Sequence, residues 1–104
     1  MLRGNHETRE MTTFYNFRDQ CIKSYDEEVY ERISDAFESL PVAAVVNSNL
    51  LSLHGGISPQ LDELDDIQQI DRKKEPRHTE LLMDLLWADP MKQARANALH
   101  YETN

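Results

Sequence analysis

Two short runs of this sequence contain side chains that bind metal ions and transfer protons. Leu2-Arg3-Gly4-Asn5-His6-Glu7 places an amide oxygen beside an imidazole, and Leu53-His54-Gly55-Gly56-Ile57-Ser58-Pro59 supplies a second imidazole. Amide oxygens and imidazole nitrogens suit Zn, Fe or Mn, and a positioned histidine can protonate a leaving oxygen. These are the groups that metal-assisted hydrolysis of a phosphate monoester needs.

In this order and at this separation, the two runs resemble two signature motifs of the phosphoprotein phosphatase family, the metal-dependent serine/threonine phosphatases. The resemblance implies that Asn5 and His54 ligate the same metal ion. It also implies that His6 is the general acid that protonates the departing serine or threonine oxygen. The other motif residues are expected to support the site without binding metal: Arg3, Gly4, Glu7, Gly55 and Gly56.

Two further motifs of that family, G-D-x-H-G and G-D-x-x-D-R-G, are absent from this sequence. They carry the remaining upstream metal ligands, one phosphate-binding arginine and the aspartate that orients the counterpart of His6. Another histidine ligand and a second arginine are expected beyond Asn104. We therefore expect residues 1–104 to be the central part of a single metallophosphoesterase catalytic domain, and to be inactive in isolation.

For the complete enzyme, the resemblance implies two metal ions, Fe and Zn or Mn, that activate a water for direct attack on phosphoserine or phosphothreonine. Leu64-Asp65-Asp66-Ile67 and Asp71-Arg72-Lys73-Lys74-Glu75-Pro76 look most like the calcineurin branch of the family. The partners implied are phosphoprotein substrates and, for the parent protein, a calcium-binding regulatory subunit and calmodulin.

Two other functions remain open. The chain could be a non-catalytic truncated or decoy module that engages phosphatase partners, and a coding sequence continuing upstream into G-D-x-x-D-R-G would argue against this. A general metallophosphoesterase acting on nucleotides or small phosphates is disfavoured, because Glu7 and the H-G-G-x-S-P run are those of the protein phosphatases.

Composition narrows the class of protein further. The 104 residues amount to one domain or less, and 39% apolar with 29% charged residues is typical of a globular chain. A net charge of −8 argues against a nucleic-acid surface. The single cysteine, Cys21, cannot form an internal disulfide, and the longest apolar run, Val42 to Val46, is too short to span a bilayer. No signal peptide precedes the first motif, so a cytoplasmic protein is expected, with the nucleus as the alternative.

The elements that must position the two motifs follow from periodicity and turn signals. Apolar spacing predicts one amphipathic helix from about Thr8 to Ser24 and, after a Ser24–Glu27 capping box, a second helix that Pro41 ends. Val42–Val46 is typical of a strand buried on both faces, Asn47–Asn49 of a turn, and Leu50–Leu53 of a second strand that delivers His54.

Further helices are predicted over Leu64–Ile70 and His78–Leu86, the second packing through Leu81, Leu82, Leu85 and Trp87, with a charged loop between the two helices. Residues 92–104 are polar and carry no prediction. His78 and His100 are expected at the surface, and Cys21 partly buried on its helix.

The resemblance implies an α/β (α+β) fold: the metallophosphoesterase sandwich, two β-sheets flanked by helices with the metal ions at one sheet edge. Neighbouring strands would be missing, which leaves exposed edges.

Overall fold

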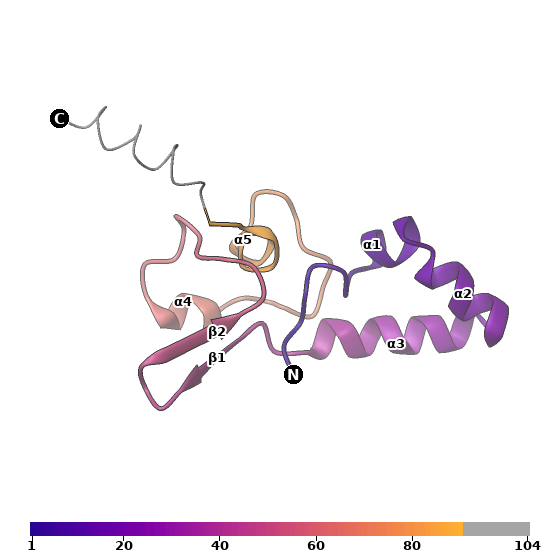
Figure 1. Ribbon diagram of the computed structural model, residues 1–104, viewed down its shortest axis with the longest axis horizontal. Coiled ribbons are helices and arrows are strands. Elements are labelled where there is room, and N and C mark those ends of the chain that lie inside the picture. Colours follow the sequence, from indigo (N-terminus) through magenta and orange to yellow (C-terminus); the bar gives the residue numbers. More distant parts are fainter. Residues whose placement is uncertain (91–104) are drawn as a thin grey trace.

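The computed structural model describes residues 1–90, which form five helices and one two-stranded antiparallel sheet (Figure 1). In chain order the elements are α1 (Arg9–Phe14), α2 (Phe17–Ser24), α3 (Glu27–Ser39), β1 (Ala43–Val46), β2 (Leu50–Leu53), α4 (Leu64–Gln68) and α5 (Leu81–Trp87). The first three helices lie together at one end of the molecule, and the hairpin, α4 and α5 lie at the other (Figure 1). The predictions for residues 92–104, and for His100, fall outside the described residues.

The single helix predicted over residues 8–24 is wrong, because the structure divides it into α1 and α2. Thr8 caps the start of α1, where its hydroxyl accepts a hydrogen bond of 3.2 Å from the Met11 N–H. The break lies at Asn16, whose φ of 68° is left-handed. Asparagine tolerates this conformation better than most residues, so the helix can stop there. The apolar spacing continues across the break, and for that reason it predicted a single helix.

Helix α3 begins at a different cap from the one predicted. Asp26 Oδ1 accepts a hydrogen bond of 2.8 Å from the Val29 N–H, whereas Ser24 is the last residue of α2. Ionised Asp is an N-cap at least as good as Ser, and its negative charge suits the helix N-terminus. The predicted end is confirmed: Leu40 is extended, as the residue before a proline prefers, and Pro41 follows.

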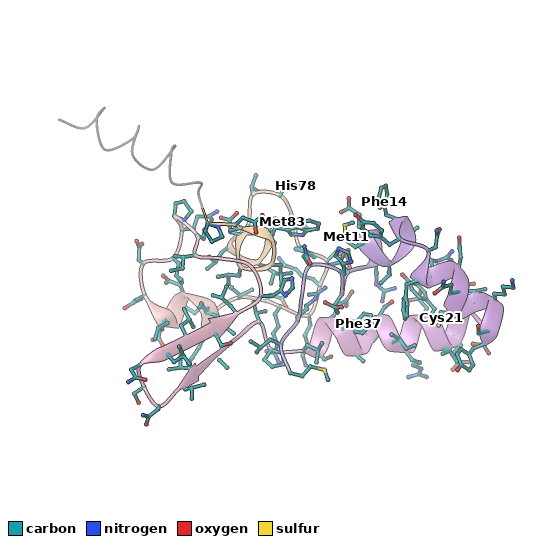
Figure 2. The ribbon with its side chains drawn as sticks, in the orientation of Figure 1. Met11, Phe14, Cys21, Phe37, His78 and Met83 are labelled. Atoms are coloured by element: carbon teal, nitrogen blue, oxygen red, sulfur yellow. The ribbon has the colours of Figure 1, made fainter. Side chains whose placement is uncertain are left out.

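The three helices pack through a small buried contact layer. Cys21 on α2 and Tyr30 on α3 are buried, and the Thr12 hydroxyl of α1 lies 2.8 Å from the Tyr30 hydroxyl. Phe17 and Phe37 place their rings 6.1 Å apart. Figure 2 shows Cys21 where α2 faces α3; its place on a helix is confirmed, and it is more fully buried than the partial burial that was expected.

Strands β1 and β2 form the predicted hairpin, with Ala43 opposite Leu53 and Val46 opposite Leu50. Asn47 and Ser48 both have positive φ, 53° and 58°, as a type I′ turn requires.

The prediction that the first strand is buried on both faces is wrong within residues 1–90. Val45 and Val46 each expose 50% of their surface, and Leu50 exposes 58%. Two strands alone cannot cover both faces of an apolar strand, because burial on both faces needs other elements packed above and below the sheet.

The main apolar core lies between the hairpin, α4 and α5. Leu82, Leu85 and Leu86 of α5 and Val42, which precedes β1, are buried together, and Leu53 and Ile67 pack against them. Helix α5 is shorter than predicted, and Leu86 takes the buried place expected of Trp87, which is 41% exposed. The helix predicted over residues 64–70 is confirmed in a shorter form, as α4.

Among residues 1–90, no helix is long and apolar enough to cross a membrane. His78 lies exposed on the loop before α5, as expected (Figure 2).

Candidate metal centre

The structure brings Asn5 and His54 together although 49 positions separate them in the chain. Asn5 Oδ1 lies 3.0 Å from His54 Nε2. Asn5 is half-buried on the turn before α1, and the exposed His54 directly follows β2. Two ligands that each lie about 2.1 Å from one metal ion are about 3.0–3.4 Å apart at angles of about 90–110°. The two side chains make a direct hydrogen bond in this structure, and their spacing is also compatible with two ligands of a single ion.

The chemistry of the pair also fits a metal ion. An amide oxygen and an imidazole nitrogen suit Zn, Fe or Mn, as the resemblance implies. Within residues 1–90, however, no three His, Cys, Asp or Glu side chains gather to hold a metal. The described part of the chain thus offers a pair of candidate ligands, and a complete site would need further donors.

A tight turn presents Asn5 and His6. The Glu7 N–H donates to the Gly4 carbonyl at 3.2 Å, and the Gly4 N–H donates to Glu7 Oε2 at 3.0 Å. A Cβ on Gly4 would lie 2.5 Å from Glu7 Oε2 and 3.3 Å from the His54 ring. A side chain at Gly4 would thus displace the Glu7 carboxylate that supports the turn and would crowd the His54 ring.

Arg3 stands behind this turn as a fully buried guanidinium. Its Nε donates to the Glu7 carbonyl at 3.0 Å, and its Nη1 donates to the carbonyls of Arg72 at 3.2 Å and Lys74 at 2.9 Å. Its Nη2 lies 3.9 Å from Glu75 Oε1 and, within residues 1–90, has no hydrogen-bond partner. Burial lowers the pKa of Arg3, and the negative charge of Glu75 opposes that shift. The side chain therefore ties the turn of Asn5 to the loop at 72–75.

That loop is a positioning element that sequence reasoning described only as charged. Glu75 accepts hydrogen bonds from the Arg9 N–H at 2.6 Å and the Glu10 N–H at 3.4 Å, at the start of α1. Arg72 donates to the carbonyls of Leu40 at 3.2 Å and Ser39 at 3.3 Å, at the end of α3. The negative Glu75 thus lies at the positive N-terminal end of α1, and the positive Arg72 lies at the negative C-terminal end of α3.

A sequence signal for this loop existed in its dense run of basic and acidic residues, Asp71 to Glu75. The helix ends that these charges meet, however, lie 30 to 70 positions away, so no local rule could pair them. Arg9 adds a second link between α1 and α3, with hydrogen bonds to Glu31, Asp35 and Glu38. The hydrogen bond that Arg9 donates to the Glu31 carboxylate raises the pKa of Arg9 above its ordinary value.

His54 is held from its C-terminal side by α5. The Gly55 N–H donates to the Leu85 carbonyl at 2.9 Å, and a Cβ on Gly55 would lie 2.6 Å from the Leu86 carbonyl carbon. A Cβ on Gly56 would lie 2.9 Å from the Ala88 carbonyl oxygen. Both glycines therefore allow the backbone after His54 to lie against the backbone of α5 and of Ala88, the residue that follows it.

His6, the neighbour of Asn5 in the chain, packs against an aromatic ring at the end of α1. Its ring stacks on Tyr15, with centroids 4.8 Å apart and planes 15° from parallel. Both rings line a hollow of about 240 Å³ that Met11, Phe17 and Phe37 also border. The apolar spacing of residues 8–24 did not indicate that Tyr15 would contact His6. Helix α1 has only six residues and Tyr15 is its C-cap, an end that the apolar periodicity did not predict.

Comparison with known proteins identifies the family to which this fold belongs. The family model of calcineurin-like phosphoesterases matches residues 1–102, and the chain belongs to that family. The α/β fold class expected from the sequence is thereby confirmed.

Individual relatives are serine/threonine phosphatases. The chain is 41% identical over 93 residues to the serine/threonine-protein phosphatase 2B catalytic subunit A2 of Saccharomyces cerevisiae, a match that covers 89% of this chain and 15% of the relative. A solved protein serine/threonine phosphatase from S. cerevisiae, described as similar to human phosphatase PP5, superposes with a TM-score of 0.82 at 38% identity. That match covers 86% of this chain and 29% of the solved one. The chain therefore spans less than a third of either relative.

Proposed function

We propose that the complete protein containing this chain is a serine/threonine protein phosphatase that hydrolyses phosphoserine and phosphothreonine. The observation that carries the proposal is the 3.0 Å approach of Asn5 Oδ1 to His54 Nε2 beside a second histidine, in a chain whose relatives are phosphatases. Bound metal ions would supply an activated water and neutralise charge on the phosphoryl oxygens.

The residues of this chain have distinct parts in that chemistry. Asn5 and His54 would hold one metal ion between the turn before α1 and the end of β2. His6 would carry the proton that the departing serine or threonine oxygen needs, because an alkoxide leaves poorly without one. Arg3, Gly4 and Glu7 would fix the turn, while Gly55 and Gly56 anchor His54 to α5.

The proposal extends to the identity of the metal ions and to the regulation of the parent protein. We infer two metal ions, Fe and Zn or Mn, and regulation of the parent protein by a calcium-binding subunit and calmodulin in the cytoplasm. What supports the regulation is the likeness of Leu64–Ile67 and Asp71–Pro76 to the calcineurin branch, together with 41% identity to a phosphatase 2B catalytic subunit.

Metal binding by the purified chain tests the pair directly. We expect Mn²⁺ or Zn²⁺ to bind, and we expect Asn5→Ala or His54→Ala to weaken binding by at least about 100-fold, because even residues that only orient a ligand contribute about 10–100-fold. Isothermal titration calorimetry measures the affinity, and His78→Ala is the control, since that histidine is exposed and belongs to neither motif. Equal loss in all three variants would contradict the assignment of Asn5 and His54.

The isolated chain is expected to release no measurable phosphate from a phosphothreonine peptide. The reason is that residues 1–90 supply a pair of metal donors and no further cluster of ligands. Phosphate release with Mn²⁺ present is the measurement. Turnover that disappears on His54→Ala would show instead that the pair is sufficient for activity.

A further inference from the structure

We propose that Tyr15 is a positioning residue that holds the His6 imidazole in one orientation. The inference rests on the proposed function, in which His6 must aim a proton at a leaving oxygen. In the family that this chain resembles, an aspartate outside this chain orients the corresponding histidine. The stack with Tyr15 supplies a constraint from within the chain.

The geometry of the stack is that of a held ring. The two centroids are 4.8 Å apart and the planes differ by 15°. The Tyr15 N–H donates to the Met11 carbonyl at 2.9 Å, at the end of α1, and the left-handed Asn16 follows. The Phe14 ring meets Tyr15 edge-on, 4.9 Å away at 84°. The backbone of Tyr15 is therefore fixed by a hydrogen bond, and its ring, which is 57% exposed, is contacted on its edge side by the Phe14 ring.

Stacking can fix the plane of the His6 ring while it leaves the ring nitrogens accessible. The outer torsion of a histidine side chain has broad minima, so an exposed imidazole needs an external contact to fix its plane. A stacked neighbour covers one face of the ring, whereas protons are carried on nitrogens at its edge. The hollow beside the ring would let an unstacked imidazole turn. The measured strength of aromatic pairs corresponds to about a two- to tenfold preference for the stacked orientation.

The test is nuclear magnetic resonance of the full 104-residue chain with ¹³C-labelled histidine. In the wild-type chain we expect a nuclear Overhauser contact between the His6 and Tyr15 rings and an upfield ring-current displacement of the His6 carbon-bound protons. We also expect a high order parameter for the His6 ring. Tyr15→Phe should keep all three, and Tyr15→Leu should lose the displacement and the order. His78 serves as the internal reference, and His6→Gln assigns the signals.

Absence of the contact in the wild-type chain, or an equally ordered His6 ring in Tyr15→Leu, would overturn the proposal. Loss of order in Tyr15→Phe would overturn it too, since that variant keeps the ring and removes the hydroxyl. Tyr15→Met is the second non-aromatic variant should Tyr15→Leu not fold. Because this readout needs neither metal nor substrate, its failure is distinguishable from failure of the proposed function, which the metal titration tests.

Discussion

Replacing Arg3 by alanine is expected to lower the free energy of unfolding by about 3–5 kcal/mol. The substitution removes a fully buried guanidinium and leaves the carbonyls of Glu7, Arg72 and Lys74 without their donor. Each buried polar group left unsatisfied costs about 1–3 kcal/mol, and water that enters the space offsets part of the sum. Urea denaturation followed by circular dichroism measures the loss.

Arg32 provides a matched arginine on the surface. Its guanidinium lies 3.6 Å from Glu28 on the same helix, and both side chains are more than three-quarters exposed. Arg32→Ala is therefore expected to change stability by less than about 0.5 kcal/mol. Arg3→Lys should fall between the two variants, since an ammonium keeps the charge but cannot span three carbonyls as the planar guanidinium does. Equal effects of Arg3→Ala and Arg32→Ala would refute the role of Arg3 as a buried link.

Leu85→Ala is expected to cost about 2–5 kcal/mol, because it opens a cavity at the centre of the main core. Leu85 has no exposed surface and packs with Val42, Leu82 and Leu86. Its carbonyl also receives the Gly55 N–H, so movement of α5 into the cavity would shift the residue next to His54. Denaturant unfolding monitored by the fluorescence of Trp87, the single tryptophan, measures the stability of this core.

The matched control for Leu85 is Leu50, which is 58% exposed at the start of β2. Leu50→Ala should change stability by no more than about 0.5 kcal/mol, since little apolar surface is buried there. Calorimetric titration of both variants with Mn²⁺ then asks whether the core supports the Asn5–His54 pair. We expect weaker binding for Leu85→Ala and unchanged binding for Leu50→Ala. The reverse order of stability would mean that the core does not lie where the structure places it.

The two variants with large expected effects share a feature of this molecule. Neither Arg3 nor Leu85 belongs to the candidate metal pair, yet each holds one half of it. Arg3 fixes the turn that bears Asn5, and Leu85 holds the backbone that follows His54. Small chains bury a modest fraction of their surface, so a single lost contact of this kind is a large share of total stability.

Local signals predicted the elements that depend on near neighbours. The hairpin, the end of α3 at Pro41 and the placement of His54 after β2 are confirmed, because turn residues and short apolar runs act over a few positions. The predicted cap at Ser24 and the unbroken helix across Asn16 are wrong, because a nearby carboxylate and a left-handed residue override periodicity.

By itself, the sequence determined which side chains are available for chemistry: Asn5, His6 and His54, carried in two motifs whose resemblance to the phosphoprotein phosphatases indicated the family. Only the tertiary structure decided that Asn5 and His54 lie 3.0 Å apart, that Arg3 is buried, and that the loop at 71–76 bridges the ends of α1 and α3. These contacts join residues more than 30 positions apart, and packing of the whole chain, not local propensity, sets such distances.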